Sequence, residues 1–385
     1  MNYFLTEEQE MIKDLARQIA EEKFKPLRAE MDETAEFPWE LVKVLRESDM
    51  FGIYLPEEYG GLGGGVLELC LAVEEMSRVC GGMALSLAAT ALATFPILLS
   101  GSEDQKKKYL PDLASGKYLA AFALTEPDAG SDAGATKTTA RKDGDNYILN
   151  GTKCFITNGS VADIITVIAM TDKSRGSRGA SAFIVEKGME GFSVGKEEHK
   201  MGIRSSSTSE LIFEDCQVPK ENLISREGMG FIVAMKTLDQ SRPGVAAQAL
   251  GIAQGALDAA IDYARQRKQF DRPIITFQGL QWMLADMATR VEAARALVYS
   301  VARSADGGEK RVAKDSAMCK LFASDVAMSV TTDAVQILGG YGYMKEYPVE
   351  KMMRDAKITQ IYEGTNQIQR DVIGTQLIRE SASRK

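Results

Sequence analysis

The stretch DNYILNGTKCFITNG, residues 145–159, marks a change of pattern in the middle of the chain. Its Asn150-Gly151 pair stands between two apolar runs, and this arrangement is the strongest short signal for a β-hairpin. We therefore predict a hairpin that turns at Asn150-Gly151. A chain with such a segment at its centre is not wholly helical.

Three further segments of the middle region have the composition of strands. They are ADIITVIAM (162–170), SAFIVEK (181–187) and TSELIFEDCQVP (208–219), and each is bounded by Gly, Ser, Asp or Pro. Together with the hairpin, they predict a small β domain over residues 121–230.

Helical patterns occupy both ends of the chain. TEEQ at residues 6–9 is a capping box, which predicts the start of a helix. Beyond Gly230, long segments at 230–270, 277–306 and 313–340 repeat apolar residues at helical spacing. One predicted buried face contains Leu284, Met287, Val291, Ala294 and Val298.

These patterns together predict an α+β multidomain protein. We expect an N-terminal α-helical domain over residues 1–120, a middle β domain over 121–230, and a C-terminal domain resembling a four-helix bundle over 231–385.

A glycine-rich segment, PEEYGGLGGG at residues 56–65, requires a separate decision. Its glycines do not have the GxGxxG spacing, and no strand clearly leads into them. We interpret the segment as a loop rather than as the phosphate-binding turn of a dinucleotide domain.

Composition excludes several classes of function. The chain has 385 residues, a net charge of −8 and a pI near 5.1, so a nucleic-acid partner is not expected. The five cysteines lack CxxC spacing, and neither a metal site nor a disulfide framework is indicated. We expect no targeting segment and no membrane span, and therefore a cytoplasmic, bacterial protein.

The single histidine, His199, lies in the charged run GKEEHK. A His-based triad is therefore not expected, and an enzyme with this sequence would need a carboxylate, a cysteine or a cofactor for its chemistry. The segment TQIYEGTNQIQRDVIG (359–374) offers such a carboxylate, Glu363, followed directly by Gly364. Gly364 permits a close approach of backbone or ligand, although a surface Glu beside a helix end is the simpler local interpretation.

Six segments in order along the chain resemble the acyl-CoA dehydrogenases. They are LTEPDAGSD (124–132), FITNG (155–159), RPGVAAQALGIAQGALD (242–258), RKQFDRPIITFQ (267–278), QILGGYGYMKEYPVEKMMRD (336–355) and IYEGTNQIQR (361–370). The resemblance runs over nearly the whole chain.

The resemblance implies an FAD-dependent enzyme that oxidises an acyl-CoA thioester to its α,β-enoyl form. In this family the Glu of the IYEGT motif, here Glu363, removes the α-proton while a hydride leaves the β-carbon for flavin N5. Electrons then pass to an electron-transferring flavoprotein. Because the α-proton of a thioester is very weakly acidic, the reaction also needs preorganised donors for the enolate oxygen in a dry pocket. Burial is expected to raise the pKa of Glu363.

Ser241 decides between two subtypes of the family. A branched-chain subgroup carries its base immediately before the Arg of the RPGVAAQALG-like segment, where this chain has Ser241. The chain therefore resembles the type whose base is Glu363. Short, medium, branched and cyclic acyl-CoAs all remain open as substrates.

The resemblance also implies the residues that hold the cofactor and the substrate. The cofactor-binding positions are Phe122, Leu124, Thr125, Ser131, Phe155, Thr157, Arg267, Phe270, Gln278, Gln336, Gly339, Gly340, Thr365 and Gln367. The substrate-binding positions are Ser131, Asp239, Arg242 and Gly364. No metal is expected.

Some of these positions are expected to reach the FAD of a neighbouring subunit. Arg267, Phe270 and Gln278 belong to this set, and Gln336, Gly339 and Gly340 are expected on its adenosine side. The resemblance therefore implies a homotetramer. Without it, Arg267 would be interpreted equally well as a cation at a helix end.

Two other classes of function remain open from the sequence. One is an acyl-CoA oxidase or flavin monooxygenase on the same fold, which would differ in its reaction with oxygen. The other is a non-catalytic scaffold that binds flavin or acyl-CoA only as structure.

Overall fold

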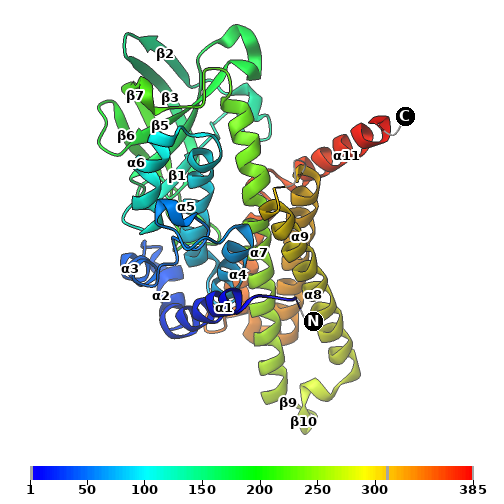
Figure 1. Ribbon diagram of the computed structural model, residues 1–385. Coiled ribbons are helices and arrows are strands. Elements are labelled where there is room, and N and C mark those ends of the chain that lie inside the picture. Colours follow the sequence, from blue (N-terminus) through cyan, green and yellow to red (C-terminus); the bar gives the residue numbers. More distant parts are fainter. Residues whose placement is uncertain (1–2, 309–311, 384–385) are drawn as a thin grey trace.

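A computed structural model describes residues 3–308 and 312–383 of the chain. Its elements fall into an N-terminal group of helices, a middle sheet and a C-terminal group of long helices (Figure 1). The sheet lies at one end of the molecule above the N-terminal helices, and the long helices run along one side of both (Figure 1).

The N-terminal helices begin as the sequence predicts, at a capping box formed by Thr6 and Gln9. Their bounds are α1 (Glu7–Ile19), α2 (Lys25–Thr34), α3 (Trp39–Glu47), α4 (Val66–Ser77), α5 (Gly81–Ser100) and α6 (Glu103–Ala114). A π-helical turn, Ala20–Phe24, joins α1 to α2. Almost every side chain of α4 and α5 is buried, so these two helices form the core of this region.

The glycine-rich segment at 56–65 is a loop, as predicted. It contains one 3₁₀ turn, Glu57–Tyr59, and leads directly into α4. The chain before it ends in α3 and turns rather than in a strand, so the arrangement of a dinucleotide-binding turn is absent from the described residues at this place.

The middle region forms an eight-stranded sheet in the order β6-β7-β3-β2-β4-β5-β8, with β1 paired to β4. The strands are β1 (Ala120–Ala123), β2 (Thr139–Asp143), β3 (Asn146–Thr157), β4 (Ile164–Met170), β5 (Ala180–Glu186), β6 (Phe192–Glu197), β7 (Thr208–Pro219) and β8 (Leu223–Ile224). The predictions for β4, β5 and β7 are confirmed, and the sheet is mixed because β1 pairs in parallel with β4.

The predicted hairpin turn at Asn150-Gly151 is wrong. β3 continues through this pair, and the turn lies between Asp143 and Asn146, at Gly144 with φ +59°. Asn150 instead faces a β-bulge in β7: its side chain accepts from the N–H of Asp215 at 2.9 Å and donates to the Asp215 carboxylate at 3.0 Å. Asp143-Gly144 is also a turn signal. The strand that precedes it, β2, is largely charged and exposed, so its sequence does not have the composition of a strand.

The C-terminal helices are α7 (Gly230–Gln266), α8 (Gln278–Asp306), α9 (Ala313–Leu338), α10 (Val349–Thr359) and α11 (Asn366–Ser383). α7 runs through Pro243 as one helix, and the predicted apolar face of α8 is buried from Met287 to Val298. A short two-stranded ribbon, β9 (Lys268–Gln269) with β10 (Arg272–Pro273), lies at the far end of α7. α11 projects away from the body of the molecule (Figure 1).

α5 and α7 are long and apolar enough to cross a membrane by length and composition alone. In each, however, 78% of the most apolar window is buried inside the protein. Such burial is typical of the core helices of a globular domain. α5 and α7 also pack against each other, so the N-terminal and C-terminal helices are in direct contact.

Candidate active site

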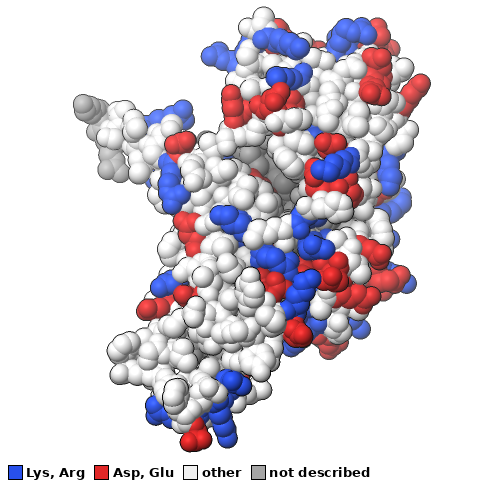
Figure 2. Space-filling model, turned by 180° about the vertical axis from the view of Figure 1, so that it is seen from behind, with Lys and Arg blue, Asp and Glu red and all other residues white. Residues whose placement is uncertain are grey.

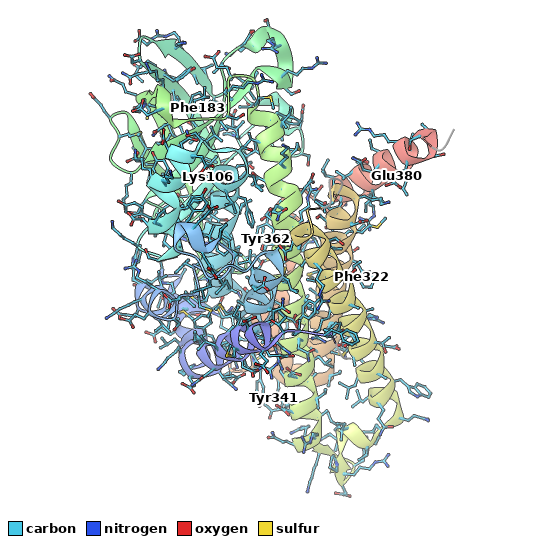
Figure 3. All side chains as sticks on the ribbon, viewed as in Figure 1. Lys106, Phe183, Phe322, Tyr341, Tyr362 and Glu380 are labelled. Atoms are coloured by element: carbon cyan, nitrogen blue, oxygen red, sulfur yellow. The ribbon has the colours of Figure 1, made fainter. Side chains whose placement is uncertain are left out.

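A cavity of about 470 Å³ lies between the sheet, α5, α7 and the loop that joins α10 to α11. We call it the Glu363 cavity. Of the residues singled out from the sequence, it is lined by Phe122, Leu124, Thr125, Ser131, Phe155, Thr157, Arg242, Glu363 and Gly364. Segments far apart in the sequence therefore meet at one place. Tyr362, the neighbour of Glu363, lies in the middle of the molecule between the N-terminal helices and the long C-terminal ones (Figure 3).

Glu363 is presented by a short loop between the end of α10 at Thr359 and the start of α11 at Asn366. Both Glu363 (φ +51°) and Gly364 (φ +94°) have left-handed backbone conformations. A non-glycine residue in this region costs free energy and is held there by its surroundings, which is a frequent property of functional sites.

The carboxylate of Glu363 accepts a hydrogen bond from the Ser241 hydroxyl at 2.5 Å. Burial raises the pKa of Glu363 above its usual range, while the Ser241 hydrogen bond and the charges of Arg242 and Lys320 oppose the rise. A carboxylate with a raised pKa in an enclosed, largely apolar cavity is suited to accept a proton.

The backbone N–H of Glu363 has no backbone acceptor within the part of the chain that the structure describes. Two residues further on, the Thr365 carbonyl accepts from Gln369 N–H at 2.9 Å, so α11 begins regularly just beyond this point. An unpaired N–H next to the carboxylate is available to a ligand in the cavity.

A β-bulge presents Phe155 to the cavity. Between the register pairs Lys153–Leu211 and Ile156–Ser209, β3 contains one more residue than β7. Phe155 lies in this bulge with φ +57°, and 64% of its surface is exposed. Bulges next to active sites commonly redirect a side chain, and here the flanking Lys153 and Ile156 stay buried while the aromatic ring is left uncovered.

A buried ion pair holds the loop that follows β1. Lys153 donates to the Leu124 carbonyl at 2.9 Å and to the Glu126 carboxylate at 2.7 Å. Glu126 also accepts from the backbone N–H groups of Lys137 and Thr138. Burial lowers the pKa of Lys153 to about 8, because it disfavours the charged amine, and the Glu126 carboxylate opposes this effect.

Arg242 on α7 closes another side of the cavity. Its guanidinium donates to Asp239 at 2.8 Å, and its Nε is buried without a partner in the described part of the chain. Burial lowers the pKa of Arg242 and raises that of Asp239. Asp239 itself does not line the cavity. The Arg242 side chain as a whole lines the cavity, and a guanidinium in a cavity wall suits a ligand that carries carbonyl or phosphate oxygens.

The remaining predicted residues lie elsewhere. Arg267, Gly339 and Gly340 line a second depression, together with Tyr263 and Tyr341, and we call it the Arg267 hollow. The Arg267 guanidinium lies over the Tyr341 ring, 5.4 Å from its centroid. The two spaces share no lining residue.

Phe270, Gln278 and Gln336 are exposed residues of the same end of the molecule, and Phe270 is 88% exposed. This end carries few charges apart from its tip, where basic and acidic side chains both appear (Figure 2). Thr365 accepts from the Ile368 N–H and so caps α11, while Gln367 is exposed on α11.

Sequence reasoning missed several residues that line the Glu363 cavity. On α7, Phe231, Met235 and Leu238 line it with Arg242, and their spacing of i, i+4, i+7 and i+11 describes one helix face. Tyr362, Ile368 and Val372 line it from the other side. The helical spacing was the signal available for the α7 residues.

Three family models match the chain in sequence. The N-terminal, middle and C-terminal domain models of acyl-CoA dehydrogenase match residues 6–117, 121–216 and 228–378. The matched segments cover most of the chain, and they include both the cavity residues and the Arg267 hollow.

Individual proteins give the same result. A short-chain-specific acyl-CoA dehydrogenase of Clostridium acetobutylicum is 54% identical over 98% of this chain and 100% of its own length. The solved structure of butyryl-CoA dehydrogenase from Megasphaera elsdenii has a TM-score of 0.96 and 50% identity, covering 98% of this chain and 100% of that one. A chain of the structure described as the electron transferring flavoprotein of Acidaminococcus fermentans has a TM-score of 0.96 and 56% identity, with 98% and 100% coverage.

The chain therefore belongs to the acyl-CoA dehydrogenase family, a family of oxidoreductases. Its members are flavoproteins, and the cofactor of this chain is FAD. The Glu363 cavity fits such a group: it offers an uncovered aromatic face at Phe155, the hydroxyls of Thr125, Ser131 and Thr157, and open space at Gly130, where an added Cβ would meet no atom within 4 Å.

Proposed function

We propose that the protein dehydrogenates an acyl-CoA thioester between Cα and Cβ, with Glu363 as the base that removes the α-proton. One observation carries the proposal: a carboxylate with a raised pKa faces a cavity in which Phe155 and Thr157 also lie. The chemistry that bound FAD would supply at this site is a hydride acceptor for the substrate Cβ. The residues that would hold FAD in this chain are Phe122, Leu124, Thr125, Ser131, Phe155 and Thr157.

Three groups around Glu363 would have separate roles in proton abstraction. The Glu363 carboxylate accepts the proton, and the raised pKa brings its proton affinity closer to what the weakly acidic substrate requires. The Ser241 hydroxyl fixes one carboxylate oxygen. The unpaired Glu363 N–H supplies a donor for the oxygen that gains charge as the α-proton leaves.

We infer a short-chain acyl-CoA as the substrate. The relative from Clostridium acetobutylicum is named as short-chain specific, and the relative of known structure from Megasphaera elsdenii is named butyryl-CoA dehydrogenase. Arg242 and Ser131 line the cavity and would bind the polar CoA portion, while Leu85, Ala89 and Leu92 of α5 offer an apolar wall for the acyl chain.

We also propose that a second copy of the chain completes the cofactor site. The Arg267 hollow is separate from the Glu363 cavity, so its residues and those of the cavity would contact one FAD only across a subunit boundary. Exposed Phe270, Trp282 and Tyr343 at this end supply apolar area for such a contact. A homotetramer with the FAD shared between subunits is the arrangement we expect.

The electron acceptor that we propose is an electron-transferring flavoprotein. The similar chain in the Acidaminococcus fermentans structure supports this choice. A cytoplasmic location is supported by the five cysteines, which are all free and buried.

The decisive experiment replaces Glu363 by Gln. Purified Glu363→Gln should keep bound FAD and its yellow colour, yet its flavin should not bleach when butyryl-CoA is added. We expect kcat to fall by about 10²- to 10⁴-fold, the usual contribution of a general base. Glu346→Gln, a surface change, is the matched control and should bleach normally.

Bleaching that survives in Glu363→Gln would refute the proposed base. A colourless wild-type protein that binds no FAD would favour the scaffold interpretation instead. Rapid peroxide formation during aerobic turnover, in place of electron transfer to the flavoprotein acceptor, would identify an oxidase.

A further inference from the structure

A buried lysine lies directly behind the loop that carries Glu363. Lys320 on α9 has 0% of its surface exposed. Its ammonium group donates to the Gly364 carbonyl at 2.8 Å and to the Asn366 side-chain oxygen at 2.9 Å. Lysine is almost never fully buried unless it is paired. Here both hydrogen-bond partners are neutral oxygens, one from the loop at Gly364 and one from Asn366, the first residue of α11.

The same loop is held from its other side by Gln369 of α11. The Gln369 amide donates to the Gly364 carbonyl at 2.8 Å and to the Glu363 carbonyl at 3.2 Å. Asn366, the second partner of Lys320, is itself bound by Ser324 and Asp325 of α9. Both carbonyls that follow the base are therefore occupied by donors from α9 and α11.

This arrangement explains how Glu363 stays in a left-handed conformation. The two peptides that follow Glu363 are held through their carbonyls: Gln369 binds the Glu363 carbonyl, and Gln369 and Lys320 together bind the Gly364 carbonyl. With these carbonyls held, the carboxylate and the unpaired N–H of Glu363 remain on the cavity side. A loop without these anchors would relax toward a less costly backbone conformation.

The two cations that face the base both favour the ionised form of its carboxylate. Glu363 is faced by Lys320 from α9 and by Arg242 from α7, and both lower its pKa against the effect of burial. Asp239 in turn faces Arg242, Asp325 faces Lys320, and the phenol of Tyr362 lies next to Glu363 in the loop. Of these groups, Lys320 is the one that also bonds to the Gly364 carbonyl. Burial lowers the pKa of Lys320 to about 7, and its amine can donate to that carbonyl in either protonation state.

We propose that Lys320 is a positioning residue for the base: its side-chain amine holds the Gly364 carbonyl from the α9 side of the loop and so keeps the Glu363 carboxylate aimed into the cavity. This inference rests on the proposed role of Glu363. It assigns to a residue of α9, remote in sequence from the IYEGT motif, a share in the reaction that mere burial would not give it.

The test compares Lys320→Met, Lys320→Gln and Glu363→Gln, all purified with FAD. The first readout is an infrared titration of the Glu363 carboxyl band, isolated by subtracting the spectrum of Glu363→Gln. The second is kcat and KM with butyryl-CoA. In Lys320→Met we expect the titration midpoint of Glu363 to move to higher pH and kcat to fall by about 10- to 100-fold, with KM within about twofold.

Lys320→Gln separates the hydrogen bond from the charge. It keeps a donor for the Gly364 carbonyl, so part of kcat should return, while the higher titration midpoint should remain. Lys314→Met is the matched control, since Lys314 lies on the same helix and pairs with Glu380 rather than with the loop. It should change neither readout.

An unchanged midpoint and unchanged kcat in Lys320→Met would overturn the inference while Glu363→Gln stays inactive and the proposed function stands. Activity in Glu363→Gln would instead overturn the proposed function. Should Lys320→Met not fold, Lys320→Gln decides alone: an unshifted Glu363 midpoint in that variant overturns the inference.

Discussion

The Glu363 cavity and the Arg267 hollow are built in opposite ways. The cavity is enclosed by elements from three parts of one chain, and its carboxylate is shielded enough for burial to raise its pKa. The hollow lies at the open end of α7, where Gly339 and Gly340 are exposed and Phe270 is 88% exposed. Proton chemistry favours a site with restricted access to water, and the residues that shield Glu363 here all come from one chain. A surface that only binds can be left open for a partner to cover.

The largest effect on this contrast is expected from Gly364→Ala. Gly364 has φ +94°, and an added Cβ would lie 2.7 Å from the Gln369 amide nitrogen that holds the loop. Either the Gln369 side chain moves away and releases the carbonyls that it holds, or the loop shifts, and the left-handed φ is strained for alanine in both cases. A displacement of the base by about 1 Å can cost on the order of 100-fold in kcat. Stopped-flow bleaching with butyryl-CoA measures this loss.

Gly374→Ala is the control for that change, because Gly374 lies inside α11 and an added Cβ meets no atom within 4 Å. We expect it to be neutral or slightly stabilising. Equal rates in the two variants would show that the loop tolerates the strain and that the enclosed cavity is less rigid than its contacts indicate.

Arg267→Gln should affect the open end instead. If Arg267 binds cofactor phosphate across a subunit boundary, losing this charged donor should weaken FAD binding by roughly 10- to 100-fold. The titration of Glu363 should not move. Fluorescence titration of FAD into the apoprotein, with size-exclusion chromatography of the product, gives both the affinity and the assembly state.

Arg265→Gln is the matched control, since Arg265 is exposed two residues earlier and does not line the hollow. An FAD affinity that is the same in both variants would remove the hollow from the cofactor site.

The smallest effect is expected from Ser241→Ala. The Ser241 hydroxyl lowers the pKa of Glu363 by donating to its carboxylate, so its loss raises that pKa further. Because the base acts only when ionised, activity is lost on the acidic side of the raised pKa, and the acidic limb of the pH–rate profile moves to higher pH. We expect about a 2- to 10-fold loss at acidic pH and little change at alkaline pH. A shift of the limb to lower pH would contradict this assignment.

The sequence predicted the middle strands well where their composition was unambiguous. β4 and β5 are buried and apolar, and β7 alternates in burial, so their segments were found. β6 was missed because its residues are exposed or half-buried and include Lys196 and Glu197. The hairpin was misplaced because two turn signals lie close together, at Asp143-Gly144 and Asn150-Gly151, and local patterns do not rank them.

The site was predictable only in part for a related reason. Glu363 and the cavity residues stand in recognisable motifs, but the bulge that exposes Phe155 follows from pairing between β3 and β7. Lys320 precedes its partner Gly364 by 44 residues and sits in a helix with an ordinary pattern. Long-range contacts of this kind leave no local trace in a single sequence.

α7 links the two regions mechanically. Arg242 lines the cavity and Arg267 follows the last turn of the helix, so they lie roughly 37 Å apart along the axis at about 1.5 Å per residue. The length of α7 therefore sets both the distance and the relative orientation between the Glu363 cavity and the Arg267 hollow. One residue inserted between Arg242 and Arg267 would rotate the rest of the helix by about 100°. Arg267 would then point in a different direction, although the Glu363 cavity would be unchanged.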